Sequence, residues 1–415
     1  MSVAHPPASP IAGSLRNASP QSFDVSPLLM AQATQLFTFA PANSGGAQVY
    51  LATLRNGKVV NPQLLLTNDT SSAFTPAGGG RVLFVRNDNL FSQKLDLKAR
   101  KLSGDPELVQ EHVASYAGLR LAYFSVSHTG AIAWRSGSAV VSQVAIFDRK
   151  GNRAGTAGAP GPVTYVALSP DGSRLIASGD TGAWLVDASG PGQVTLNPEV
   201  GRASIWSSDG SRLIFLTRDL KIREWRVGGS SEIRELGEIP ATERMMPNLG
   251  GISPDGRRML YGDFASGLFS LALGDGAAPQ RVVGQRADNF ALSPDGMWVA
   301  YVPRSERAVY VQPISGDKLP RRIGTGSYAV WRGDGKEILY RDRDRGGIMS
   351  VKVDGSGQNL SFGAAELLFP VAEPMGLVSP SRPLAVNHDG SRIYFLQSRE
   401  QPDSGVIHVR TGAIR

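Results

Sequence analysis

The chain has 415 residues, 41% of them apolar, which is enough to build a sizeable core and argues against wholesale disorder. It contains no cysteine, so disulfide bonds and thiolate metal sites are excluded, and its 48 glycines and 27 prolines favour many turns over long helices. The net charge of +7 is spread along the chain without long runs of like charge, which argues against a nucleic-acid-binding surface.

The first 33 residues are rich in proline, alanine and serine, and we expect a flexible tail over residues 1–33. This segment has no charged stretch followed by an apolar one, so the chain as it stands carries no signal peptide. No stretch approaches the roughly 18 apolar residues that a membrane span needs. As it stands, the chain is therefore expected in the cytoplasm without a transmembrane segment, and these features leave its actual compartment open.

Weak repeats begin after the tail and continue over residues 34–156. A partial unit, "LFTFAPANSGGAQVYLATL", starts at Leu36, and a fuller one, "AFTPAGGGRVLFVRNDNLFSQKLDL", starts at Ala73. A third unit, "FSVSHTGAIAWRSG" from Phe124, continues into "VAIFDRKGNRAGTAG" from Val144. Apolar runs separated by glycine-containing turns predict antiparallel hairpins.

Clear repeats follow over residues 157–412, where an Asp-Gly pair recurs six times at intervals of 38 to 55 residues. Intervals of this length are typical of the four-stranded blades of a β-propeller. In the Ser-Pro-Asp-Gly form of the repeat, proline presets the turn and glycine supplies a positive φ, which predicts a three-residue hairpin with a glycine bulge. The predicted structural turn residues are Asp171, Gly172, Asp209, Gly210, Asp255, Gly256, Asp295, Gly296, Asp334, Gly335, Asp389 and Gly390.

Apolar positions flank each of these turns. The residue three places before the aspartate is always large and apolar, and Trp206 and Trp331 occupy this column, so we expect them in the core. The run after the glycine, such as Leu175-Ile176-Ala177, does not alternate with polar residues. Both faces of that strand are therefore expected to be buried between neighbouring sheets.

The sequence predicts an all-β propeller of four-stranded antiparallel blades over residues 34–415. About nine units can be counted, the first and last of them incomplete. We predict one ring of eight blades, closed by pairing of N-terminal strands near Val49 or Leu64 with a C-terminal strand at Ile407. The alternative is a six-bladed ring from about residue 157 onward, preceded by a partial propeller.

These repeats resemble the TolB-like propeller repeat, a relative of the WD-type repeat. Their order is similar to that of the propeller region of bacterial receptor-like serine/threonine kinases, on the basis of "FSVSHTGAIAWRSG", the Ser-Pro-Asp-Gly units and "WRGDGKEILY" from Trp331. The resemblance covers roughly residues 36 to 412 and implies a sensing or protein-interaction module outside the cytoplasmic membrane. The chain departs from those receptors because it carries no kinase motif.

No local motif for catalysis, cofactor binding or metal binding is present. The five histidines lack the i, i+4 spacing of a helical metal pair, and His128 and His388 are expected in hairpin turns. The stretch "DRDRGG" from Asp342 has Val353 where a calcium loop needs glutamate. There is no nucleophile elbow and no phosphate-binding loop.

Three functions remain open from the sequence. The leading hypothesis is a non-catalytic scaffold that binds a protein or ligand through its loops, with a protein as the expected partner and no cofactor. The second is a propeller hydrolase or lyase whose site is assembled from separated carboxylates at the channel mouth. The third is a detached sensory domain of a kinase-type receptor.

Overall fold

The described part of the computed structural model consists almost entirely of β-strands, with a short 3-10 turn at Ala77–Gly79 (η2). It divides into two compact units, one formed by Met1–Ala139 with Glu400–Arg415 and the other by Val140–Arg399. Within the described ranges, no helix has the length and hydropathy of a membrane crossing. The structure describes residues 28–29, 34–39, 47–55, 58–68, 70, 72–116, 121–136, 141–179, 182–196, 200, 204–217, 219–229, 232–240, 247–263, 266–274, 278–316, 318–356, 359–372, 382–398 and 406–414.

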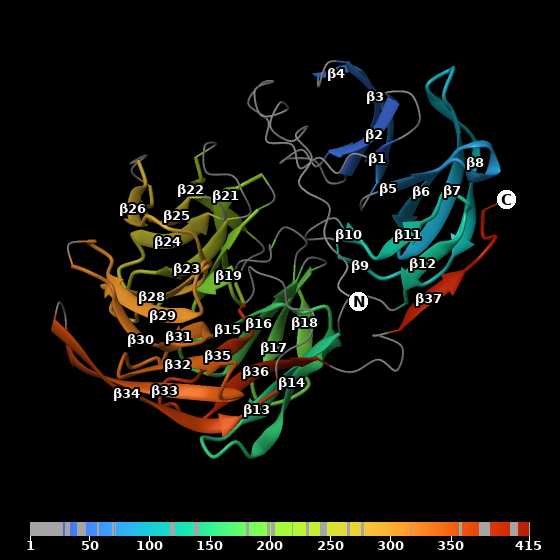
Figure 1. The fold of residues 1–415 in the computed structure, drawn as a ribbon. Coiled ribbons are helices and arrows are strands. Elements are labelled where there is room, and N and C mark those ends of the chain that lie inside the picture. Colours follow the sequence, from blue (N-terminus) through green and yellow to red (C-terminus); the bar gives the residue numbers. More distant parts are fainter. Residues whose placement is uncertain are drawn as a thin grey trace. The chain divides into compact units, whose positions relative to one another are not determined.

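The second unit is built from six four-stranded antiparallel sheets (Figure 1). The innermost strands are β15 (Tyr165–Leu168), β19 (Ser204–Trp206), β23 (Asn248–Ile252), β27 (Ala287–Leu292), β31 (Ser327–Trp331) and β35 (Leu384–Val386). The second strands are β16 (Arg174–Gly179), β20 (Arg212–Leu216), β24 (Arg258–Asp263), β28 (Trp298–Pro303), β32 (Glu337–Asp342) and β36 (Ile393–Ser398). The third strands are β17 (Gly182–Asp187), β21 (Lys221–Arg226), β25 (Gly267–Ala272), β29 (Ala308–Pro313), β33 (Gly347–Ser356) and β13 (Ser142–Phe147). The outermost strands are β18 (Gln193–Thr195), β22 (Ile233–Glu238), β26 (Gln280–Val283), β30 (Arg321–Thr325), β34 (Asn359–Pro370) and β14 (Arg153–Gly161).

These six sheets form a closed ring. Each innermost strand contacts the innermost strand of the next sheet, and β35 contacts β15, which completes the cycle. The sixth sheet has the order β14-β13-β36-β35, so its two outer strands come from the start of the unit and its two inner strands from the end. Six consecutive residue pairs join β13 to β36, from Ser142↔Ser398 to Phe147↔Ile393. The predicted propeller of four-stranded antiparallel blades is confirmed in this unit.

Apolar strands and two tryptophans pack the ring. Every residue of β28 and β32 is buried, as expected for a strand with a sheet on each side. The indole N–H of Trp206 donates a hydrogen bond to the carbonyl of Ala167 on the preceding inner strand at 2.9 Å. Trp331 makes the same contact with Ala291 at 3.1 Å. Both tryptophans are core residues, as predicted, and each joins one blade to the blade before it.

The described residues of the first unit form two four-stranded sheets, a two-stranded hairpin and a three-stranded sheet. Its strands are β1 (Leu28–Leu29), β2 (Thr34–Phe39), β3 (Ala47–Arg55) and β4 (Lys58–Asn68); β5 (Ser72–Thr75), β6 (Arg81–Arg86), β7 (Asn89–Asp96) and β8 (Lys101–Gln110); β9 (Ser115–Tyr116) and β10 (Leu121–Ala122); and β11 (Phe124–Val126), β12 (Ile132–Arg135) and β37 (Ile407–Arg410). Of the predicted tail, only Leu28–Leu29 lie within the described residues, and they pair with β2.

The strand pairing predicted for an eight-bladed ring is wrong. Ile407 pairs with Arg135 of β12, not with strands near Val49 or Leu64. β13 takes the third place in the closing sheet, where β36 and β14 flank it. Every residue of β13 is buried, which fits a strand inside a sheet. The predicted third strand at Ile407 instead completes a sheet of the first unit, where His408 stacks on Trp134 with ring centroids 5.2 Å apart.

Candidate functional site

The six Asp-Gly turns adopt the backbone predicted for them. Their glycines have φ between +69° and +75°, which confirms the positive φ expected at this position. Each turn joins an innermost strand to a second strand, as between β15 and β16. In the first of them, Ser169 N–H donates to the carbonyl of Arg174 at 2.8 Å, so four residues form the loop. The loop is therefore one residue longer than predicted.

Each Ser-Pro-Asp-Gly turn holds its own aspartate. In the first turn, Ser169 Oγ donates to Asp171 Oδ1 at 2.5 Å, and Ser173 Oγ donates to Asp171 Oδ2 at 2.7 Å. Ser169 Oγ also accepts the backbone N–H of Arg174 at 3.0 Å. Hydrogen bonds from both serines lower the pKa of Asp171. The carboxylate is thus committed to the hairpin, which supports the structural role proposed for these residues.

The second turn shows the same chemistry more strongly. A hydrogen bond from Ser207, with others from Ser211, lowers the pKa of Asp209 to about 2. Among the described residues, no group of three or more histidine, aspartate or glutamate side chains is placed to hold a metal ion.

The fifth turn replaces this pattern with a buried charge network. Arg332 stands where the first four turns have serine, and its guanidinium binds Asp334 through Nε at 2.6 Å. Its Nη1 also donates to Glu337 at 3.0 Å. Glu337 is only 2% exposed and further accepts Arg149 Nη2 at 2.6 Å and the hydroxyl of Ser350. Burial raises the pKa of Glu337, but the hydrogen bonds from Arg149 and Ser350 outweigh it, so the pKa is lowered.

The network joins the fifth sheet to the sheet that closes the ring. Arg149 lies in the hairpin between β13 and β14, and its Nη1 also donates to the carbonyl of Gly390 at 3.3 Å. The sequence analysis missed Glu337, although the repeat contained a signal for it. Four of the six units have arginine at the second position after the glycine, whereas this unit has glutamate there and arginine in place of serine. A new arginine and a new glutamate in the same unit, Arg332 and Glu337, predict an ion pair between them.

A small hollow lies beside the first and sixth turns, with a volume of about 410 Å³. Asp171 and Asp389 are among its lining residues, together with His388 and Arg392. Hydrogen bonds within the same turn lower the pKa of both aspartates. Their carboxylates are therefore held by the backbone and hydroxyls of the turns and are poorly suited to catalysis.

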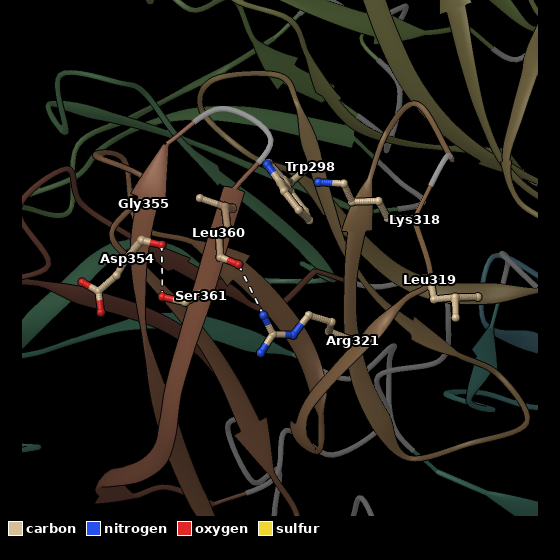
Figure 2. A pocket seen from close by; sticks show the side chains of 8 residues that line it. All are labelled: Trp298, Lys318, Leu319, Arg321, Asp354, Gly355, Leu360 and Ser361. Atoms are coloured by element: carbon tan, nitrogen blue, oxygen red, sulfur yellow. Dashed lines mark hydrogen bonds between the residues drawn. The ribbon is translucent and has the colours of Figure 1, made fainter.

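A second hollow is a groove of about 440 Å³ between the outer parts of the fourth and fifth sheets (Figure 2). Its walls come from the start of β28, the segment leading into β30, and the ends of β33 and β34 that face each other. The groove is lined by Trp298, Lys318, Leu319, Arg321, Asp354, Gly355, Leu360 and Ser361.

Apolar side chains form both the base and the rim of this groove. Trp298 is 4% exposed, whereas Leu319 is 88% exposed, the highest value among the large apolar residues that the structure describes. The Trp298 ring meets the edge of Phe362 on β34, with centroids 6.5 Å apart and planes at 79°. Sequence analysis missed the groove because its walls come from strands of two different repeats. An isolated leucine in the polar segment "GDKLPRR" was the available signal.

Arg321 crosses the groove from the fourth sheet to the fifth. Its Nη1 donates to the carbonyl of Leu360 at 3.3 Å, and its guanidinium carbon lies 5.1 Å from the centroid of the Phe362 ring. Figure 2 shows Arg321 directed toward Leu360, while the carboxylate of Asp354 points away from it. The site thus combines an apolar surface with one cation held in a fixed position.

The remaining candidate residues have structural surroundings. His128 and His388 lie in turns, as predicted, and His408 Nε2 lies 2.9 Å from the hydroxyl of Ser136. Asp342, which opens the "DRDRGG" stretch, accepts the backbone N–H groups of Asp344 and Arg345 at 2.9 and 3.0 Å. This is the hairpin loop that the sequence favoured over a calcium site.

No known protein-family profile matches the sequence. No curated protein matches it either. Among solved structures, a putative TolB from Agrobacterium tumefaciens is 17% identical with a TM-score of 0.47, and the match covers 63% of this chain and 100% of that one. A functionally unknown protein from Desulfotomaculum acetoxidans is 12% identical with a TM-score of 0.42, and the match covers 70% of this chain and 92% of that one. A nidogen/laminin complex matches at 8% identity and a TM-score of 0.40, over 62% of this chain and 97% of that one.

A TolB protein is thus among the solved structures to which the chain is similar. The propeller assignment itself comes from the sheets and their cyclic contacts.

Proposed function

We propose that the second unit is a non-catalytic scaffold that binds a partner protein in the groove between its fourth and fifth sheets. The observation that carries this proposal is the exposed Leu319 beside the buried Trp298, because a large apolar side chain left in water at the rim of a groove is typical of an interaction site. The surrounding blades supply a rigid support for it.

An extended peptide segment suits this groove better than a small molecule does. Small-molecule sites bury most of the ligand within a closed concave pocket. Here the rim residue Leu319 is almost fully exposed, and the walls are formed by the outer strands of two sheets. A peptide can cover Leu319 and place one side chain against Trp298 at the same time.

Selection of ten-residue random peptides displayed on phage tests the proposal. Peptides enriched on the wild-type protein are expected to bind it and to lose binding to the Leu319→Asp variant, because the new charge would be buried by the peptide. Val194→Asp is the matched control, since Val194 is also an exposed apolar residue of the second unit, on β18. Peptides that bind both variants equally well would place the binding site elsewhere, and a selection that enriches nothing would contradict the proposal.

A further inference from the structure

Arg321 gives the groove a chemical preference that goes beyond its shape. Within the described chain, the contact with the Leu360 carbonyl is the only hydrogen bond of this side chain. A guanidinium group has five N–H donors. Most of the donors of Arg321 are therefore available to a ligand, while the cation–π contact with the Phe362 ring helps to hold the guanidinium in place.

We infer that the groove recognises an extended peptide segment in which an acidic residue neighbours a large apolar residue. This inference rests on the proposed function. The apolar side chain would pack on Leu319 and Trp298, and the carboxylate would accept hydrogen bonds from Arg321. A planar guanidinium matches a carboxylate through two parallel hydrogen bonds, which adds geometric selectivity to the charge attraction.

The arrangement of charge in the groove supports an acidic ligand. Lys318 lines the same wall as Arg321, so the side of the groove that leads into β30 is positive. The acidic residue of the lining, Asp354, lies on β33, and its carboxylate points away from Arg321 (Figure 2). A peptide carboxylate beside Arg321 therefore meets a guanidinium from which the acidic side chain of the lining is turned away.

The expected gain from this contact is modest because the groove is open to solvent. Ion pairs between partly exposed groups contribute up to about 1 kcal/mol. We expect a Glu→Gln change in a selected peptide to weaken its binding about three- to fivefold at low salt. Salt screens such pairs, so the difference should shrink between 0.05 and 0.5 M NaCl.

The experiment repeats the phage selection on the Arg321→Gln variant. Wild-type protein is expected to enrich peptides with aspartate or glutamate next to a large apolar residue, and the variant to enrich the apolar residue alone. Arg322→Gln is the control, because Arg322 is the next residue of β30, is absent from the groove lining and binds Thr325. This control should keep the acidic preference.

Fluorescence anisotropy with the best selected peptide and its Glu→Gln analogue gives the quantitative readout. If both peptides bind wild-type protein with equal affinity and both lose binding to the Leu319→Asp variant, the acidic preference is overturned and the proposed function still stands. An acidic preference that survives in Arg321→Gln would assign the recognition to another residue and overturn the inference. Failure to enrich any peptide would contradict both proposals.

Discussion

At the scale of single residues, the Asp-Gly turn is a local structure whose properties follow from four neighbouring residues. The positive φ of its glycines was predictable because no tertiary contact is needed to require it. The loop length was not, because the serine hydroxyls hold one more residue in the loop than a simple glycine bulge does. In the first turn, Ser169 and Ser173 both bind Asp171, which ties the two ends of the loop together.

The glycines of these turns differ in what surrounds them, and this predicts different costs of substitution. A Cβ atom at Gly256 would meet nothing within 4 Å, whereas at Gly296 it would lie 2.9 Å from Pro254 Cδ. We expect Gly256→Ala to lower the free energy of unfolding by about 1 kcal/mol through backbone strain alone. Gly296→Ala should cost about 2–3 kcal/mol, because a steric clash adds to the strain.

Urea unfolding followed by tryptophan fluorescence measures both changes. Gly190→Ala is the control, since a Cβ there also meets nothing and its backbone is outside the left-handed region. Equal losses at all three glycines would show that positive φ does not determine the cost.

At the scale of elements, hairpins were predictable and the contacts between repeats were not. Each second strand follows its turn directly, so β16, β20 and β24 were found from apolar runs after the glycine. The pairing of β13 with β36 joins residues about 250 positions apart, and no local sequence pattern in either strand predicts which strand it pairs with. The groove was missed for the same reason, since β30 and β34 meet only after the blades have packed.

Glu337 links the fifth sheet to the sheet that closes the ring through its ion pair with Arg149. We expect Glu337→Ala to lower the free energy of unfolding by about 3–5 kcal/mol, because Arg149 and Arg332 would lose a buried partner. Glu366→Ala on the exposed face of β34 is the control and should change the free energy by less than about 0.5 kcal/mol.

The pH dependence of this link has a defined sign. Because the pKa of Glu337 is lowered in the folded protein, its contribution is complete above the ordinary value of 4.5 and fades as the pH falls below it. The difference in free energy of unfolding between wild type and Glu337→Ala, measured by urea unfolding, should therefore become smaller as the pH falls below 4.5. A difference that is constant from pH 7 to pH 3 would show that the carboxylate charge is not involved.

At the scale of the whole molecule, the sheet that closes the ring sets the boundary of the second unit. Since β13 and β14 supply its outer half, the ring requires residues before 157, which the sequence alternative of a six-bladed ring had placed outside it. The Asp-Gly repeats pointed to the later hairpins, whereas the hairpin of β13 and β14 has no Asp-Gly pair. The unit therefore begins near Val140.

Two fragments test this boundary. The fragment 140–399 contains all strands of the ring and is expected to unfold in one cooperative urea transition. The fragment 157–399 lacks β13 and the first part of β14, which leaves the edge of β36 without a partner strand, so it should unfold at lower urea concentration with a smaller slope. Identical transitions for the two fragments would show that the β13–β36 pairing does not close the ring.

The pairing of β12 with β37 has a consequence for the synthesis of the protein on the ribosome. Arg135 pairs with Ile407, so the edge of β12 gains its partner only after the entire second unit has emerged. At typical elongation rates of about 5–20 residues per second, this delay is about 14 to 54 seconds. During that time the growing chain presents an unpaired strand edge, which is a target for chaperones and for pairing with a neighbouring nascent chain.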